Sequence, residues 1–259
     1  SKTKKLAENN ATVFDSPKHI AESSDLIITC VKDADAVKEV LFGNDGITSG
    51  KYTDLAVADM STINPTSAQE ISKKLHTMKI KSLEIPVMGG PNVAIDGGLV
   101  LMASGDKELF ETHQKIFKTI ANKIFFLGES GSAHTIKLAM NMQISLLALS
   151  LSEGIILMKK AGIEPEKFLE ILNSTYFGTG MSEKKAYKMI KNEYEPTFTL
   201  KNLKKDLDII AKTAKDFDAV LPITERANKI YDDALAAGFG ELDYTGVLAY
   251  IEKISRTKD

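Results

Sequence analysis

One lysine and one asparagine stand four positions apart in the most apolar stretch of the chain. Lys137 and Asn141 share a face if this stretch is a helix. A lysine in such surroundings either extends along the helix surface to solvent, with the asparagine beside it, or serves a functional site, because an isolated buried ammonium is costly. The stretch joins two differently patterned halves of the chain, where clefts usually form, so we favour a functional lysine.

Three segments that follow predicted strands are further candidates for ligand binding. They are Val31-Lys32-Asp33, Met60-Ser61-Thr62 and Pro86-Val87-Met88-Gly89-Gly90. In open α/β sheets, ligands bind at the carboxyl ends of strands, so these loops are expected to face one crevice. The glycine pair lets backbone N–H groups approach a carboxylate or phosphate closely. Glycine after a strand is more often a simple turn, and only the joint placement of the three segments favours a site.

The elements that position these residues follow from hydrophobic periodicity. Strands are expected over 26–31, 55–58, 79–85, 99–103 and 123–127. Helices are expected after the capping residues Ser16, Asp33 and Asn64, and another over 107–120. Strands separated by helices predict βαβ units and a mostly parallel sheet. From Gly128 onward only helical periodicity continues.

The sequence therefore predicts an α/β fold with two domains. Residues 1–129 form a Rossmann-like parallel-sheet domain that is incomplete at its N-terminus, and residues 130–259 form an all-helical domain. A long helix from Ser132 joins them.

Composition excludes several functional classes. The 259 residues are 43% hydrophobic, carry a formal net charge of −2 and include two arginines, which disfavours nucleic-acid binding. The apolar segment 136–158 contains too many polar side chains for a membrane span, so we expect a cytoplasmic protein. The four histidines are not spaced from one another, from the cysteine or from acidic residues as metal ligands would be, and no metal site is predicted. The single cysteine, Cys30, is expected to be buried and inert.

Motifs along nearly the whole chain support a more specific prediction. They are Asp59-Met60-Ser61-Thr62-Ile63-Asn64-Pro65, Glu84-Ile85-Pro86-Val87-Met88-Gly89-Gly90, Gly97-Gly98-Leu99, Gly128 to Asn141, Phe198 with Leu203-Lys204-Lys205-Asp206-Leu207, and Asp243-Tyr244. This series resembles the β-hydroxyacid dehydrogenases, a family that includes 3-hydroxyisobutyrate dehydrogenase, tartronate semialdehyde reductase and glyoxylate/succinic semialdehyde reductases. The most specific match is the Gly-x-x-Gly-x-x-x-x-x-Lys-x-x-x-Asn pattern ending at Asn141.

The resemblance implies an NAD(P)-dependent interconversion of a small β-hydroxyacid and its aldehyde or semialdehyde by hydride transfer. Lys137 would be the general acid that protonates the carbonyl oxygen, and the base in the reverse direction, and Asn141 would position the substrate. The implied carboxylate-binding residues are Met88, Gly89, Gly90, Ser174 and Thr175. The implied dinucleotide-binding residues are Val31, Lys32, Ala36, Ser61, Thr62 and Lys205. Lys205 is also a candidate for the second cation that would lower the pKa of Lys137.

Departures from the family pattern set further expectations. Met88 stands where the family has serine, so the substrate is expected to differ from 3-hydroxyisobutyrate. No Gly-x-Gly-x-x-Gly follows an N-terminal strand, and an opening βαβ unit of roughly 30 residues is expected to be missing from a longer chain. Lys2, Lys4 and Lys5 would lie near the adenine ribose, which favours NADP over NAD.

Two other functions remain open at this point. The first is a non-enzymatic binding or oligomerisation module with a degenerate nucleotide fold. The second, a 6-phosphosugar dehydrogenase, is disfavoured by the short helical domain and the scarcity of arginines. The apolar helices of the second domain predict a homodimer or homotetramer.

Overall fold

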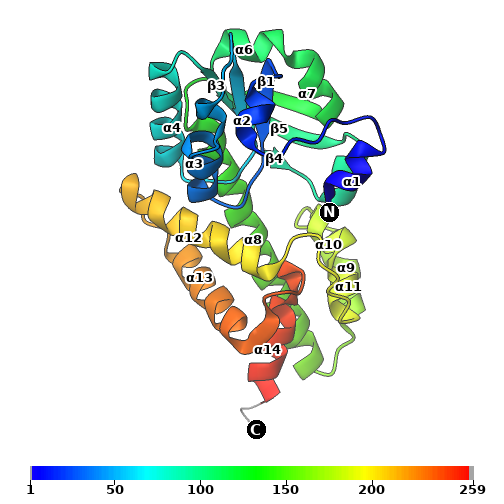
Figure 1. Cartoon of the computed structure of the whole chain (residues 1–259). Coiled ribbons are helices and arrows are strands. Elements are labelled where there is room, and N and C mark those ends of the chain that lie inside the picture. The colour runs from blue at the N-terminus through cyan, green and yellow to red at the C-terminus, as the bar shows by residue number, and fades with distance from the viewer. Residues whose placement is uncertain (1, 257–259) are drawn as a thin grey trace. The chain divides into compact units, whose positions relative to one another are not determined.

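The computed structural model describes residues 2–256, which form two compact units (Figure 1). The first unit, Ser1–Lys137, is called the sheet unit here, and the second, Leu138–Asp259, the helical unit. The division falls inside the long helix α8 (Ser132–Lys160), whereas the sequence analysis placed it just before this helix.

The sheet unit is built on a mixed sheet. Its strands are β1 (Leu26–Thr29), β2 (Ala56–Asp59), β3 (Lys81–Glu84), β4 (Val87–Met88), β5 (Leu99–Gly105) and β6 (Ala121–Phe126). They are ordered β1-β2-β3-β5-β4, with β6 also paired to β5. The pairs β1/β2, β2/β3 and β5/β6 are parallel, which confirms the predicted parallel-dominated α/β fold. Strand β5 runs antiparallel to β3, and the short β4, which was not predicted, runs antiparallel to β5.

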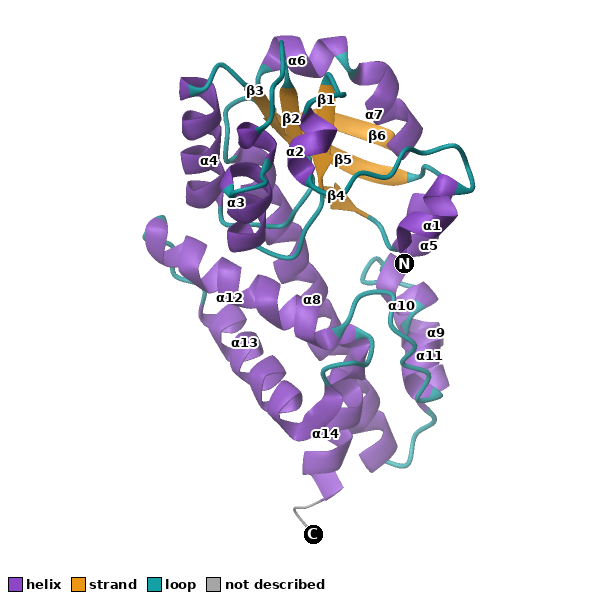
Figure 2. Ribbon diagram, in the orientation of Figure 1, coloured by secondary structure: helices purple, strands orange, loops and turns teal. Residues whose placement is uncertain are grey.

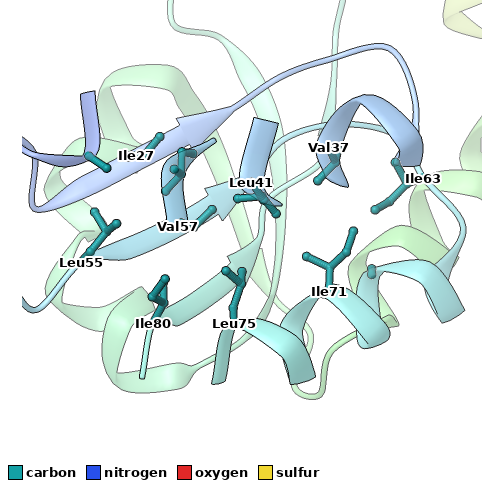
Figure 3. Close-up of a cluster of buried hydrophobic side chains, with 12 residues drawn as sticks. Ile27, Val37, Leu41, Leu55, Val57, Ile63, Ile71, Leu75 and Ile80 are labelled. Carbon is teal, nitrogen blue, oxygen red and sulfur yellow. The ribbon is translucent and has the colours of Figure 1, made fainter. Parts of the chain in front are cut away.

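Helices cover both faces of this sheet, because successive residues of its strands point apolar side chains to opposite faces and both faces must be buried. Ile27 and Val57 pack with residues of α2 (Pro17–Ala21), α3 (Ala34–Phe42) and α4 (Pro65–Thr77), and Figure 3 shows this cluster. Ala56 and Ala58 point to the opposite face and pack with residues of α6 (Lys107–Thr112) and α7 (Gln114–Ile120). Burial of both faces explains the nearly continuous apolar strands in the sequence.

Local capping determines where the predicted helices begin. The side chains of Ser16, Asp33 and Asn64 accept hydrogen bonds from backbone N–H groups of the following turn, as predicted. The prediction of one helix over 107–120 was wrong, because α6 and α7 are separated at His113. There the backbone leaves the helical region, and ring Nδ1 lies 3.0 Å from the carbonyl oxygen of Leu109. Three short helices were not predicted: α1 (Lys2–Ala7), η1 (Ile47–Ser49) and α5 (Pro91–Ile95).

The helical unit contains no strand within described residues 138–256, apart from an isolated bridge between Thr199 and Asp243 (Figure 2). Besides α8, its helices are α9 (Pro165–Asn173), α10 (Gly180–Lys184), α11 (Ala186–Ile190), α12 (Leu200–Asp216), α13 (Pro222–Ala234), η2 (Leu235–Phe239), η3 (Tyr244–Gly246) and α14 (Val247–Arg256). This agrees with the predicted helical second half.

Helix α8 contributes to both hydrophobic clusters of the helical unit. Leu138, Ala148 and Leu149 pack in the cluster formed with α12, α13 and α14, and Leu151 and Ile155 pack with α9 and α11. By length and composition alone this helix could cross a membrane. Its packed apolar side chains, together with buried polar ones such as Asn141, Ser145 and Ser152, are features of the core helix of a folded domain.

Candidate functional site

A row of buried polar side chains crosses the sheet unit where β1, β2 and β3 end. Thr29 pairs in register with Asp59, Asp59 with Glu84, and Glu84 with Ser104 of the antiparallel strand β5. All four residues are buried. The carboxyl ends of parallel strands are the usual location of ligand sites in open α/β sheets, so this row lies directly beneath the loops predicted to bind ligand.

Asp59 connects two of the loops that were predicted to contact a dinucleotide. Its Oδ1 accepts hydrogen bonds from Thr29 Oγ1 at 2.6 Å and from Ser61 Oγ at 2.8 Å. Ser61 Oγ in turn accepts from the backbone N–H of Val31 at 3.0 Å. The segments after β1 and β2 are therefore joined through one carboxylate. Sequence analysis included Asp59 in a motif but assigned it no role, because this network joins residues about 30 positions apart in the chain.

The remaining predicted cofactor residues of the sheet unit lie in these two loops or, for Ala36, in the first turn of α3. The backbone N–H of Ala36 is already bound by the capping side chain of Asp33 at 2.9 Å. Lys32 is exposed, and its Nζ lies 3.4 Å from Asp33 Oδ2. Thr62 is half-buried beside Ser61. The structure thus brings Val31, Lys32, Ser61 and Thr62 into two loops joined through Asp59.

The environment of Asp59 also affects two titratable groups. Burial raises the pKa of Asp59 above its ordinary value, against the hydrogen bonds from Thr29 and Ser61, which lower it. The prediction that Cys30 is buried was wrong: it is exposed, because it lies just beyond the end of β1. Partial desolvation, and then the charge of Asp59, raise the pKa of the Cys30 thiol, which disfavours the reactive thiolate.

The glycine loop, Met88-Gly89-Gly90, begins at the last residue of β4, which continues the antiparallel pairing of β3 with β5. Met88 ends β4, and Gly89 follows with φ of 130°, a conformation that favours glycine. A Cβ atom on Gly89 would lie 2.6 Å from Leu99 Cδ2, so this position has no room for a side chain. Gly90 is the N-cap of α5 and makes no side-chain capping bond there. Backbone groups are therefore closely accessible at this loop, as expected for a carboxylate site.

Lys137 reaches this loop. Its Nζ lies 3.0 Å from Met88 Sδ, a weak acceptor, and the lysine side chain is half-buried. The structure thus brings together an ammonium, a thioether and the glycine loop, all of which belong to the sheet unit. Lys137 and Met88 were both predicted as site residues from the sequence, but their contact was not predicted.

Asn141 lies one turn beyond Lys137 and is bound within the helical unit. Its Nδ2 donates to Asp206 Oδ2 at 2.6 Å, and both side chains are buried. Lys205, proposed as a second cation, has its Nζ 2.9 Å from Asp206 Oδ1. No role in this site was predicted for Asp206. The sequence signal for it was a helical spacing that puts this carboxylate on the same helix face as the buried residues Leu203, Leu207 and Ile210.

The two other predicted substrate residues serve the end of α9. Ser174 Oγ donates to the Glu170 carbonyl at 2.7 Å, and Thr175 Oγ1 donates to the Leu172 carbonyl at 2.8 Å. Both residues are exposed. Their hydroxyls satisfy carbonyl groups at the helix end, and their role in substrate binding stays a prediction.

His134 is completely buried in the sheet unit. Burial lowers its pKa to about 3, so the ring is neutral. Among residues 2–256, no group of three or more histidine, cysteine or acidic side chains could hold a metal ion.

Comparison with known proteins extends this description. Residues 1–128 match the NAD-binding domain of 6-phosphogluconate dehydrogenase, and residues 131–251 match the NAD-binding family of NADP-dependent 3-hydroxyisobutyrate dehydrogenase. The cytokine-like nuclear factor N-PAC of Aedes aegypti is 30% identical over 95% of the chain. The chain spans only 44% of the length of that relative.

Two further similarities cover most of both proteins. A probable 3-hydroxyisobutyrate dehydrogenase-like protein of Arabidopsis thaliana is 31% identical over 98% of this chain and 76% of its own length. The crystal structure of 3-hydroxyisobutyrate dehydrogenase from Salmonella typhimurium superposes with a TM-score of 0.81 at 26% identity, covering 91% of this chain and 82% of that chain. With two NAD-binding family matches that together extend from residue 1 to residue 251, the chain belongs to the 3-hydroxyisobutyrate dehydrogenase family of β-hydroxyacid dehydrogenases.

Proposed function

We propose that this protein is an NAD(P)-dependent oxidoreductase that interconverts a small β-hydroxyacid and its aldehyde or semialdehyde, with Lys137 as the general acid and base. The observation that carries this proposal is the contact of Lys137 Nζ with Met88 Sδ, which places an ammonium next to the glycine loop. Membership of a family of dehydrogenases supports it.

The chemistry of Lys137 follows from its surroundings. A carbonyl oxygen that gains negative charge during reduction is stabilised by a nearby ammonium, which can then donate a proton to it. The thioether of Met88 is a weak acceptor for an ammonium, and a carbonyl oxygen is a stronger one. In the reverse direction, the neutral amine of Lys137 would accept the hydroxyl proton. Asn141 would position the substrate.

We propose that the loops at the ends of β1 and β2 bind the cofactor. Val31, Lys32, Ala36, Ser61 and Thr62 would hold it there, and Lys205 is a further proposed cofactor residue. When bound, NAD(P)(H) supplies or accepts the hydride. We favour NADP, because Lys4 and Lys5 are exposed near the N-terminus and Lys32 adds another exposed cation.

The substrate is proposed to be a small carboxylate. Backbone N–H groups at Gly89 and Gly90 would bind its carboxylate, and Ser174 and Thr175 would contribute hydroxyls. Met88 offers no hydroxyl to a substrate, which disfavours 3-hydroxyisobutyrate itself. A panel of glyoxylate, succinic semialdehyde, tartronate semialdehyde and 3-hydroxyisobutyrate, each with both cofactors, identifies the substrate.

The first prediction concerns Lys137. Lys137→Ala removes the proton donor, so turnover falls by about 10²- to 10⁴-fold while the affinity for NADPH is retained. Steady-state kinetics and calorimetric titration with NADPH measure the two effects. Lys160→Ala is the matched control, since it removes an exposed lysine from the end of the same helix. Full turnover by Lys137→Ala would rule out the proposed acid.

A second candidate is a non-enzymatic binding or oligomerisation module. The similarity to N-PAC proteins, which are named as nuclear factors, favours it. Calorimetry with NADPH and NADH separates the two candidates. Micromolar binding supports the oxidoreductase, and the absence of binding supports the module.

We also propose a cytoplasmic homodimer or homotetramer. Exposed apolar side chains of the helical unit, including Ile171, Tyr176 and Phe177, provide surface that subunits could bury. Light scattering coupled to size-exclusion chromatography measures the assembly.

A further inference from the structure

Glu84 is a buried carboxylate at the end of β3 to which the proposed reaction assigns no part. It lies opposite Ser104 of β5 and next to Asp59 of β2, and only 5% of Glu84 is exposed. Burial raises the pKa of Glu84, and the charge of Asp59 raises it further, whereas hydrogen bonds from Ser130, Ser104 and Gly131 lower it. A carboxylate kept in so costly a position needs a structural reason.

Its hydrogen bonds supply that reason, because they reach the beginning of α8. Oε1 accepts from Ser130 Oγ at 2.5 Å, and the backbone N–H of Gly131 donates to both carboxylate oxygens at 2.8 and 2.9 Å. Oε2 also accepts from Ser104 Oγ at 2.7 Å, and that hydroxyl accepts from the Ala133 N–H at 3.1 Å. Glu84 and Ser104 thus satisfy N–H groups at the start of the helix, where negative charge is favourable.

Gln69 of α4 contacts the backbone at the same point. Gly131 has φ of 95°, and a Cβ atom there would lie 2.7 Å from Gln69 Nε2. The same Gln69 nitrogen donates to the Ser130 carbonyl at 3.0 Å. Helix α8 therefore begins in a tight turn that α4 holds from one side and Glu84 from the other.

The remaining neighbours of Glu84 carry no compensating positive charge. His134 Nε2 lies 4.0 Å from Glu84 Oε2, but the buried ring is neutral. Asp59, Glu84, Ser104, Ser130 and His134 line a cavity of about 20 Å³, which is roughly the space of one water molecule. Within the part of the chain that the structure describes, the ion-pair contacts include no lysine or arginine at Glu84. Its four hydrogen bonds come from neutral donors that belong to β5 and to the start of α8.

Both the backbone and the side chain of Lys137 lie next to segments connected to Glu84. The backbone lies in the second turn of α8, whose start is bound by Glu84. The Nζ contacts Met88 of β4, four residues after Glu84 in the chain. We propose that Glu84 is a positioning residue: by binding Ser130 and Gly131 it fixes the start of α8 and so holds Lys137 at the glycine loop. The catalytic importance of this position rests on the proposed function.

Kinetics provide the first test. Glu84→Ala leaves the Gly131 N–H without its acceptor and allows the start of α8 to shift. Displacement of a reacting group by about 1 Å can lower turnover by on the order of 10²-fold. We expect kcat to fall by that order while the KM for NADPH is unchanged. Glu84→Gln keeps one acceptor oxygen for Ser130 and Gly131, and is expected to retain most of the turnover. Glu129→Ala, which removes an exposed carboxylate at the same helix start, is the matched control.

Hydrogen exchange provides a second test that needs no activity. In Glu84→Ala, backbone amides of residues 131–137 are expected to exchange faster than in the wild type, while amides of α4 keep their rates. Glu84→Gln and Glu129→Ala are expected to match the wild type. Ser130→Ala removes a single hydrogen bond and should give a smaller increase, and it replaces Glu84→Ala if that variant does not fold.

The outcomes separate this inference from the proposed function. If Lys137→Ala abolishes turnover but Glu84→Ala keeps its full kcat and its slow exchange at 131–137, the positioning role is wrong and the proposed function stands. If exchange at 131–137 accelerates while Lys137→Ala retains full turnover, Glu84 fixes the helix and the proposed acid is wrong. Equal losses in Glu84→Ala and Glu84→Gln would also contradict the proposed clamp.

Discussion

Each unit contains a buried carboxylate, and the two differ in their partners: neutral hydrogen-bond donors at one and a cation at the other. Glu84 in the sheet unit is bound by hydroxyl and backbone N–H donors, and its pKa is raised. Asp243 in the helical unit accepts hydrogen bonds from Lys185 Nζ at 2.9 Å on both oxygens. Burial alone would raise the pKa of Asp243, but the hydrogen bond and charge of Lys185, together with hydrogen bonds from Thr197 and Thr245, outweigh it, and its pKa is lowered.

The difference shows what each carboxylate does. Asp243 also accepts from Thr197 and Thr245, and the Lys185 ammonium lies 4.2 Å from the centre of the Tyr244 ring, so the site joins three segments of the helical unit through one ion pair. Such a site contributes to stability at neutral pH. Glu84 lacks that electrostatic gain, which is consistent with a role in positioning α8 and not in stabilising the fold.

The largest effect that tests this contrast is expected at Lys185. Lys185→Met removes the cation and leaves Asp243 buried with only neutral donors, which is expected to lower the free energy of unfolding by about 3 kcal/mol. Urea denaturation measures the loss. Lys188→Met, at an exposed position of α11, the helix that Lys185 precedes as N-cap residue, is the control and should leave stability nearly unchanged. A loss no larger than that of the control would mean that Asp243 does not depend on its cation.

The pH dependence of stability should differ in sign between the two sites. Asp243 has a lowered pKa, so its contribution is complete above the ordinary value of 3.8 and is lost as the pH falls through the folded-state value. Glu84 has a raised pKa, so the folded protein binds this proton more tightly than the unfolded chain. Stability therefore falls as the pH rises from the ordinary value of 4.5 through the raised value.

Urea denaturation of Asp243→Asn and Glu84→Gln across the acidic range, each compared with the wild type, measures this difference. As the pH rises, Asp243→Asn should become less stable relative to the wild type, and Glu84→Gln more stable. Changes of the same sign in both variants would contradict the comparison.

The smallest expected effects come from neutral donors. Ser104→Ala removes a buried hydroxyl from Glu84, which has no cation to compensate, and is expected to cost about 1–2 kcal/mol of unfolding free energy. Thr197→Val removes an exposed hydroxyl from Asp243 while Lys185 remains, and is expected to cost less than about 1 kcal/mol. Thermal unfolding of both variants, compared with wild type, ranks the two losses. The reverse ranking would show that a neutral donor matters more at Asp243 than at Glu84, which would contradict the comparison.

The parts of the fold that were predicted correctly depend on residues close together in sequence. The helix starts at Ser16, Asp33 and Asn64 involve contacts two or three residues away, and the apolar strands express their own periodicity. Strand β4 was missed because two residues are too few to show a period, and they are held by pairing with β5. The break at His113 was missed because the apolar pattern continues through it.

The residues of the candidate site also divide into those that a local sequence pattern predicts and those that it does not. Lys137, Asn141 and the glycine loop were found from residue type, spacing and family resemblance. Glu84 and Asp206 were not, because their partners Gly131 and Asn141 lie 47 and 65 positions away in the chain. No local pattern distinguishes such a carboxylate from one that points to solvent.

By itself, the sequence determined the α/β class, the change to helices after Gly128 and the residues that could carry out chemistry, because periodicity, capping and motif spacing are local properties. Only the tertiary structure decided which acceptor each buried donor meets. It placed Lys137 against Met88, Glu84 at the start of α8 and Lys185 on Asp243. Those pairings result from packing strands and helices that are distant in the chain, and burial then makes each pairing energetically important.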